Sequence, residues 1–340
     1  MSNFTDSIHF LSKLTFKKVG NACGIFLSYY VSRIVRKPIV WGYPITISIE
    51  PTTTCNLGCP ECPSGLKSFT RPTGNLEIEN YKKLIDEISD TTIYGYFYFQ
   101  GEPFMHPKFL DLVRFATSKN LYSVTSTNAH FLTQRKAEEV VESGLSRIIV
   151  SIDGTTQEVY EQYRRGGSLE KVIQGTKNLV EAKKKLNSKT PHVILQFLVV
   201  RPNEHQIEDV KELGAALGVN EVKFKTAQIY DYENGSDLIP LSEKYSRYKK
   251  LPNGKYAIKN KLQNHCWKLW HSAEITWDGK VLPCCFDKDA KYKMGNTFSE
   301  SFKPIWKNGK YQNFRKQILK GRNQIDICRN CSEGLKVWEK

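Results

Sequence analysis

Six short β-type segments alternate with helical segments between residues 45 and 225. This alternation constrains the fold more than any other feature. Residues 76–88 and 204–218, for example, carry apolar side chains at helical spacing. Regular strand–helix alternation predicts βαβ units and a parallel sheet. Six repeats, against the eight of a complete barrel, predict an α/β fold with a partial, open (β/α)6 barrel. The expected strands are residues 45–50, 94–99, 121–127, 147–153, 192–200 and 221–225.

Three cysteines follow the first expected strand directly, in the stretch TTTCNLGCPECPSG, and they are Cys55, Cys59 and Cys62. Active sites of parallel α/β folds form at the carboxyl ends of the strands, so these thiols lie where chemistry is expected. A structural zinc ion normally takes four ligands and a disulfide takes two sulfurs. Three thiolates suit a four-iron cluster whose fourth iron stays open to an exogenous ligand.

The pattern Cys55-x-x-x-Cys59-x-x-Cys62 after a first strand resembles the signature of the radical S-adenosylmethionine (SAM) enzymes. The resemblance implies a [4Fe–4S] cluster that binds S-adenosyl-L-methionine. It also implies reductive cleavage of SAM to a 5′-deoxyadenosyl radical, which abstracts hydrogen from a substrate. The electron would come from a donor such as flavodoxin or ferredoxin. Glu61 departs from the family pattern, which commonly has an aromatic residue before the third cysteine.

Further segments at the ends of expected strands also resemble SAM-binding segments of this family. In FQGEPFMHP, with Gln100 in place of a first glycine, the resemblance implies backbone carbonyls and a carboxylate around the SAM ammonium group. For the residues at later strand ends, turn capping is an alternative role, and a salt bridge is the alternative for the arginine. The predicted SAM contacts are Gly101, Glu102, Pro103, Ser126, Asn128, Ser151, Asp153 and Arg164.

Five more cysteines lie near the end of the chain, around an expected hairpin at 271–285 with an Asp278-Gly279 turn. Their pattern resembles the SPASM extension, or its shorter relative the twitch domain. The resemblance implies a small Cys-rich α+β domain with one auxiliary [4Fe–4S] cluster. A zinc ion is the alternative for the same four thiols. Cys285 is expected to be spare, because adjacent side chains diverge, and the predicted ligands are Cys266, Cys284, Cys328 and Cys331.

The chain divides into four predicted parts: a helical segment (1–44), the barrel (45–235), a linker (236–265) and the auxiliary-cluster domain (266–335). The helical segment combines apolar residues at helical spacing with flanking lysines and arginines. It is expected to pack as a cover, with Cys23 as a small buried residue. An interfacial membrane helix is the alternative.

The formal net charge is +15, and residues 240–340 carry 22 Lys and Arg against nine Asp and Glu. Such a basic surface favours an anionic substrate, although a solvated lysine-rich surface explains it equally well. No specific nucleic-acid or membrane partner is indicated. Clustered cysteines without a signal peptide point to a cytoplasmic protein.

The resemblance implies a radical SAM oxidoreductase, and a single auxiliary cluster favours oxidation of a sugar or aminocyclitol-type substrate. In that reaction the auxiliary cluster would accept the electron that remains when a carbonyl forms. One alternative is a maturase that modifies a peptide or protein side chain. A further alternative is a non-catalytic zinc-binding scaffold or nucleic-acid-binding protein. The general base that alcohol oxidation requires is not identified by any motif.

Overall fold

The computed structural model describes residues 2–334, so the last residue of the predicted segment 266–335 lies outside the described residues. Six strands of the barrel follow one another in the sheet in chain order and run parallel. The α/β class and the partial (β/α)6 barrel are thereby confirmed. The strands are β1 (Thr46–Ile49), β2 (Tyr94–Tyr96), β3 (Tyr122–Thr127), β4 (Arg147–Ser151), β5 (His192–Val199) and β6 (Glu221–Thr226).

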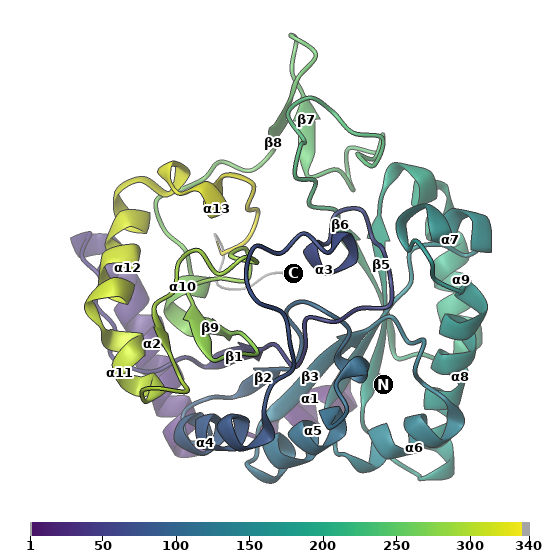
Figure 1. The fold of residues 1–340 in the computed structure, drawn as a ribbon, viewed down its shortest axis with the longest axis horizontal. Helices are drawn as coiled ribbons and strands as arrows, with labels where there is room; N and C mark the ends of the chain where they lie inside the picture. The colour runs from purple at the N-terminus through teal and green to yellow at the C-terminus, as the bar shows by residue number, and fades with distance from the viewer. Residues whose placement is uncertain (1, 335–340) are drawn as a thin grey trace.

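Helices on the outer face cover this sheet, as Figure 1 shows. Apolar side chains of the central strands, such as Ile148, Val193 and Phe197, are fully buried beneath them. Short helical turns at the carboxyl ends of strands shape the site. The elements of the barrel are α3 (Pro63–Leu66), α4 (Ile78–Ile88), η1 (Pro103–Met105), α5 (Phe109–Ser118), α6 (Gln134–Glu142), α7 (Gln157–Tyr163), α8 (Leu169–Lys185), η2 (Arg201–Gln206) and α9 (Ile207–Leu217).

The C-terminal cysteine region continues the barrel sheet. The expected hairpin is present as β9 (Ser272–Ile275) and β10 (Lys280–Leu282), which are antiparallel. Strand β9 pairs in parallel with β1, so the full order is β11-β10-β9-β1-β2-β3-β4-β5-β6. The auxiliary cysteines are therefore attached to the same sheet as the first three. The remaining elements are α10 (Lys268–His271), β11 (Gly295–Asn296), α11 (Phe302–Lys307), α12 (Gly309–Gly321), η3 (Arg322–Gln324) and α13 (Asp326–Arg329).

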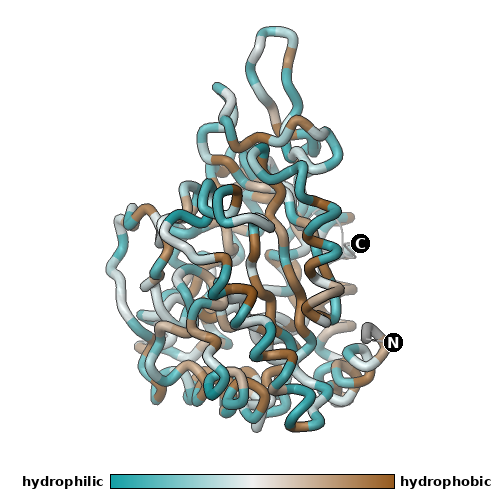
Figure 2. Tube along the Cα trace, turned by 90° about the vertical axis from the view of Figure 1, so that its right-hand side faces the viewer, coloured by the Kyte–Doolittle hydropathy of each residue, from teal (hydrophilic) through white to brown (hydrophobic). Residues whose placement is uncertain are grey.

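The predicted linker contains a small hairpin that the sequence analysis did not anticipate. Its strands are β7 (Tyr248–Lys250) and β8 (Tyr256–Ile258), and they form a sheet of their own. The hairpin projects from the body at the top of Figures 1 and 2. Its polar composition hid the strand signal, because a two-stranded arm with little burial needs few apolar residues.

Two helices precede the barrel, α1 (Ser2–Leu11) and α2 (Phe16–Val35), as expected. One face of α2 packs on the protein through Ile25 and Tyr29, and the Tyr29 hydroxyl lies 2.9 Å from His265 Nδ1. Cys23 lies on the other face and is exposed, so the prediction of a buried Cys23 is wrong. Of the helices between residues 2 and 334, none combines the length and hydropathy that a bilayer crossing requires.

Candidate active site

The first three cysteines lie on the loop between β1 and α3, at the carboxyl end of the first strand. Cys59 is buried, whereas Cys55 and Cys62 are half-buried. The Cys62 amide donates to the Cys59 carbonyl at 3.3 Å, which holds these two residues in a tight turn. Burial raises the pKa of the Cys55 thiol to about 12. The free thiol is therefore protonated at neutral pH, and a metal must displace its proton to bind.

Glu102 lies next to this loop and is almost completely buried. Its carboxylate accepts hydrogen bonds from the Thr127 hydroxyl at 2.7 Å and from the Asn128 amide at 2.8 Å. Burial raises the pKa of Glu102 to about 6, although these hydrogen bonds oppose the rise. A carboxylate enclosed by donors at a strand end provides an acceptor for an ammonium group.

Gly101 is required by the backbone at this position. Its φ angle is +75°, and a Cβ there would lie 2.3 Å from the Thr52 carbonyl oxygen. No residue other than glycine fits this approach without displacing the chain. The Gly101 amide donates to the Ser64 hydroxyl at 2.8 Å, so the segment Gly101–Pro103 is attached to the cysteine loop.

The other predicted SAM contacts have different surroundings. Ser126 and Ser151 lie on adjacent strands with their hydroxyl oxygens 3.5 Å apart, and the Asn128 side chain donates to Asn56 on the cysteine loop. Asp153 is fully buried, forms an ion pair with Arg164 and accepts from the Leu198 amide. Arg164 Nη1 lies 3.8 Å from Cys59 Sγ. Asp153 thus holds the arginine toward the cysteine loop.

Three of the predicted auxiliary ligands surround Arg322, which is buried. The three thiols are Cys266, Cys328 and Cys331, each of which raises the pKa of the Arg322 guanidinium, although burial opposes them. The guanidinium donates to Cys331 Sγ at 3.2 Å. Gly334 closes the site, because a Cβ there would lie 2.5 Å from Cys266 Sγ. A cation beside the thiols stabilises their deprotonated form.

Cys284 and Cys285 have different neighbours. Cys284 lies within electrostatic range of Cys331, whereas Cys285 Sγ accepts a hydrogen bond from Lys268 Nζ at 3.4 Å. Their mutual hydrogen bond lowers the pKa of Cys285 and raises that of Cys284, so acidity alone favours Cys285. Position is the stronger criterion, because a ligand must reach the cluster and the metal displaces the proton. Cys284 as the fourth ligand stays a prediction.

The donor set fits iron–sulfur clusters at both places. Within residues 2–334, no group of three His, Cys, Asp or Glu side chains is gathered closely enough for a single metal ion. A four-iron cluster contributes its own sulfides and is larger, and thiolates are its usual ligands.

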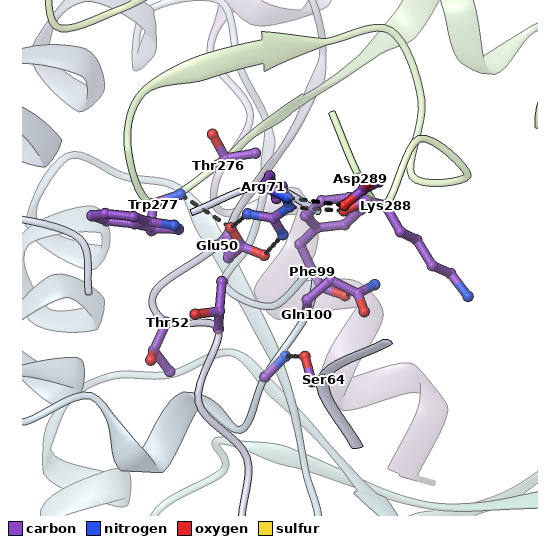
Figure 3. Close-up of polar contacts among 12 residues, drawn as sticks. Glu50, Thr52, Ser64, Arg71, Phe99, Gln100, Thr276, Trp277, Lys288 and Asp289 are labelled. Carbon is purple, nitrogen blue, oxygen red and sulfur yellow. Dashed lines mark hydrogen bonds and ion pairs between the residues drawn. The ribbon is translucent and has the colours of Figure 1, made fainter. Parts of the chain in front are cut away.

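A buried ion pair that the sequence analysis missed connects the two cysteine regions. Arg71, after the cysteine loop, makes two hydrogen bonds to the Glu50 carboxylate, at 2.9 and 2.6 Å. Its Nε donates to the Lys288 carbonyl at 2.9 Å, and the Trp277 amide donates to Glu50. Figure 3 shows this guanidinium between Glu50 and the 288–289 segment. The sequence signal that could have revealed this ion pair is Glu50, an acidic residue directly after the buried strand β1.

A cavity of about 1150 Å³ lies inside the barrel. Residues from both ends of β1, β2 and β9 line it, together with Lys225, Lys268 and Cys285. Glu274 on β9 also lines the cavity and is buried, and its Oε2 atom has no hydrogen-bond partner among the described residues. The sequence analysis did not single out Glu274. The available signal was that this acidic residue stands within a short strand of the predicted hairpin.

His106 has a local structural role, since its Nε2 lies 2.8 Å from the Leu76 carbonyl oxygen. Glu61 accepts a hydrogen bond from the Tyr230 amide at 2.9 Å, so it anchors the segment after β6.

An open parallel barrel with three thiols at the end of its first strand and a second thiol set on the same sheet defines an iron–sulfur enzyme. The family model described as radical SAM superfamily matches residues 49–214. The model of the SPASM iron–sulfur cluster-binding domain matches residues 266–332. The chain belongs to the radical SAM superfamily and carries a C-terminal SPASM domain. It is thus an enzyme that binds SAM and [4Fe–4S] clusters.

Curated relatives cover most of the chain at low identity. The tungsten-containing aldehyde ferredoxin oxidoreductase cofactor-modifying protein of Pyrococcus furiosus is 26% identical, over 84% of this chain and 86% of the relative. The S-adenosyl-L-methionine-dependent 2-deoxy-scyllo-inosamine dehydrogenase of Niallia circulans is 25% identical, over 84% and 92%. The mycofactocin maturase MftC of Mycobacterium tuberculosis is 26% identical, over 78% and 71%.

Solved structures share the fold. BtrN in complex with AdoMet and 2-DOIA has a TM-score of 0.53 at 21% identity, over 85% of this chain and 93% of that chain. Streptococcus suis SuiB bound to S-adenosylmethionine has a TM-score of 0.64 at 12% identity, over 87% and 73%. At these identities the likeness establishes the architecture alone.

Proposed function

We propose that this enzyme is a radical SAM dehydrogenase that oxidises a hydroxyl group of a sugar- or cyclitol-type substrate inside the barrel cavity. The observation that carries the proposal is the buried carboxylate of Glu274, whose Oε2 is unpartnered in the same cavity as Cys285. Alcohol oxidation needs a base within reach of the hydroxyl proton. Glu274 supplies the base that no sequence motif identified.

When bound, SAM and the two clusters supply the radical that removes a hydrogen atom from the carbinol carbon and the acceptor of the remaining electron. Glu274 accepts the hydroxyl proton, so the substrate loses two hydrogens and becomes a carbonyl compound. Burial raises the pKa of Glu274, although Lys268 opposes the rise. A raised carboxyl pKa suits a base that operates near neutral pH.

The proposed SAM contacts are the residues predicted from the sequence, except that Asp153 positions Arg164 and does not contact SAM itself. The carboxylate of Glu102 is suited to the methionine ammonium group, and the Gly101–Pro103 backbone, Ser126, Asn128 and Ser151 lie around it or on neighbouring strand ends. Arg164 suits the SAM carboxylate. Asp153 is a positioning residue, because it is fully buried and paired with Arg164.

An electron donor such as flavodoxin or ferredoxin and a cytoplasmic setting complete the proposal. All nine cysteines are free, which suits a reducing compartment. The dehydrogenase relative from Niallia circulans supports oxidation of a cyclic alcohol. The relative MftC, a maturase by name, together with the basic C-terminal region, favours peptide modification as the second candidate.

The test is anaerobic reconstitution followed by iron, sulfide and zinc analysis and by incubation with SAM, dithionite and a panel of sugars and cyclitols. We expect about eight irons per chain, as two four-iron clusters. We also expect 5′-deoxyadenosine and a product two mass units lighter than its substrate. Glu274→Gln should abolish this product and retain uncoupled 5′-deoxyadenosine formation, and Glu274→Asp should restore part of it. Zinc with little iron would overturn the proposal. A modified peptide in a parallel incubation with acidic peptides, and no oxidised sugar or cyclitol, would replace it with the second candidate.

A further inference from the structure

The exposed apolar side chains of this protein are concentrated at its N-terminal helices. Among the described residues, fifteen large hydrophobic side chains are exposed, and ten of them lie between residues 4 and 41. Phe16 is 100% exposed, Ile34 is 80% exposed and Phe4 is 72% exposed. Scattered exposed apolar residues need no explanation, but a contiguous set of this kind marks a binding surface.

On α2 these residues form one continuous stripe. Every member is exposed, and the members recur at intervals of three or four residues, which places them on one face of a helix. The opposite face, with Ile25 and Tyr29, is the one packed on the protein. The stripe consists of Phe16, Val19, Cys23, Leu27, Tyr30 and Ile34.

The charges of the N-terminal segment are mostly positive. Residues 1–45 contain six Lys and Arg and a single acidic residue, Asp6. Of the six, Lys18 is buried and Lys17 is paired with the exposed Asp90. Asp6 is already paired with Arg147 and accepts a hydrogen bond from Tyr122. A second copy of this chain would bring like charges together on this face. An anionic lipid surface complements them, since each basic residue near such a surface adds about 1 kcal/mol of attraction.

The stripe continues into the barrel cavity. Val19, Cys23 and Leu27 belong to the stripe and also line the cavity, next to Phe10 and Phe26. This end of the cavity lies at the amino ends of the strands, where Ile45 and Ile93 contribute. An apolar chain that enters between α1 and α2 would therefore stay in contact with apolar side chains along its path.

The other end of the cavity is polar and cationic. Lys225, Arg247, Lys268 and Lys288 line it against two acidic residues, Glu274 and Glu333. Lys268 is paired with Glu333. Arg247 has two buried guanidinium nitrogens, Nε and Nη1, without a hydrogen-bond partner among the described residues. Such a guanidinium is suited to two oxygens of a phosphate or carboxylate.

The cavity is larger than a monosaccharide requires. Its volume of about 1150 Å³ exceeds the roughly 300–1000 Å³ of ordinary small-molecule pockets. One end is apolar and open toward the exposed stripe, and the other contains the cations and the proposed base. This polarity matches a molecule with a long apolar tail and an anionic, hydroxylated head.

We propose that the substrate is a hydroxylated, anionic headgroup carried on a lipid, which the enzyme takes from an anionic membrane surface on which α1 and α2 lie. The inference rests on the proposed dehydrogenase function and names its substrate class. The tail occupies the apolar end of the cavity between α1 and α2. Arg247 and Lys225 bind the anionic group, and the hydroxyl to be oxidised lies at Glu274. The helices rest in the membrane interface without crossing it.

The first experiment measures sedimentation of the full-length reconstituted enzyme with vesicles of phosphatidylcholine containing 30% phosphatidylglycerol, with pure phosphatidylcholine vesicles for comparison. We expect binding to the anionic vesicles that weakens with added salt. The double variant Phe16→Ser/Ile34→Ser should reduce vesicle affinity about tenfold or more, because two side chains lose their apolar contact. Leu241→Ser removes a side chain of matched exposure, 75%, that lies between β6 and β7 and not on these helices, and it should change nothing.

The second experiment measures binding of farnesyl phosphate below its micellar concentration, with inorganic phosphate for comparison. We expect farnesyl phosphate to bind at least tenfold more tightly than phosphate, and Arg247→Gln to weaken it about tenfold. Arg247→Gln should retain vesicle binding, whereas Phe16→Ser/Ile34→Ser should retain binding of monomeric farnesyl phosphate. This crossed pattern separates the head site from the membrane surface.

Several results would overturn the inference. They are absence of vesicle binding, equal loss with Leu241→Ser, equal affinities for farnesyl phosphate and phosphate, or a dimer that covers the stripe. Formation of 5′-deoxyadenosine from SAM and dithionite is measured in parallel, because it requires neither lipid nor substrate. If SAM cleavage fails, the proposed function fails as well. If SAM cleavage proceeds without lipid binding, the lipid inference alone is wrong.

Discussion

The two cysteine sets of this enzyme are built in opposite ways. Cys55, Cys59 and Cys62 come from one loop of eight residues, and two of them are only half-buried. The predicted auxiliary cysteines come from the segment before α10, the loop after β10, and α13 with the residues just after it, and three of the four are buried around Arg322. The first set stays accessible, as a site that must admit SAM requires. The second is enclosed, which suits a cluster that transfers electrons without binding substrate.

The largest expected effect comes from the accessible set. Cys59→Ala should lower 5′-deoxyadenosine formation by more than about 1000-fold, because two thiolates cannot hold the SAM-binding cluster. The measurement is chromatographic quantification of 5′-deoxyadenosine after anaerobic incubation with SAM and dithionite. Cys23→Ala, which alters an exposed cysteine on α2, is the matched control and should keep full SAM cleavage. Cleavage retained in Cys59→Ala would show that this loop does not carry the reacting cluster.

The ion pair between the two regions is the next test. Arg71→Met leaves Glu50 buried without its partner and should destabilise the fold by about 3–5 kcal/mol. Urea unfolding of the reconstituted protein measures this difference. Arg114→Met breaks an exposed pair with Asp111 and should cost about 0.2–1 kcal/mol. Equal losses in the two variants would show that the buried pair stabilises the fold no more than an exposed pair does.

Substitutions in the enclosed cysteine set should change the iron content without affecting SAM cleavage. Cys331→Ala should remove about half of the iron, because one of two four-iron clusters is lost, and should spare SAM cleavage. Cys284→Ser should have the same effect, whereas Cys285→Ser should keep about eight irons per chain. Iron and sulfide analysis after reconstitution decides between the neighbours. Loss of iron in Cys285→Ser alone would reverse their assignment and favour thiol acidity over position.

The smallest expected effect is a pH dependence at Glu102. Its pKa of about 6 lies above the ordinary value of 4.5, so burial favours the protonated form, and that stabilisation is lost as the pH rises through 6. An ammonium group needs the ionised carboxylate. SAM affinity should therefore fall about tenfold per pH unit below pH 6 and stay level above it. Equilibrium dialysis between pH 5 and 8 measures this profile. Glu102→Gln should flatten it, and an unchanged slope in that variant would assign the proton to another group.

The sequence alone predicted most of the barrel and the cysteine loop. Strand β5, predicted as 192–200, is His192–Val199, because β-branched and apolar residues run through it without interruption. The site of the three cysteines could be predicted from their spacing and from their position after β1 alone. The predicted hairpin at 271–285 is also present, because Asp278-Gly279 favours a tight turn.

Long-range contacts could not be predicted from the sequence. Arg71 pairs with Glu50, 21 residues away in the sequence, and with Lys288, 217 residues away. No local sequence pattern encodes such pairings. Cys23 was expected to be buried, because an apolar helix normally packs on a core. The apolar residues of α2 instead occupy two faces, and only one of them packs on the protein.

The sequence by itself determined the elements, the order of the barrel strands and the position of the first cysteine set, since each depends on local periodicity or on close spacing. Only the tertiary structure decided that β9 joins the sheet beside β1, that Glu274 faces a cavity and that the cavity reaches the exposed face of α2. The physical reason is that burial and charge pairing depend on which distant segments meet. These contacts between distant segments depend on the packing of the whole chain.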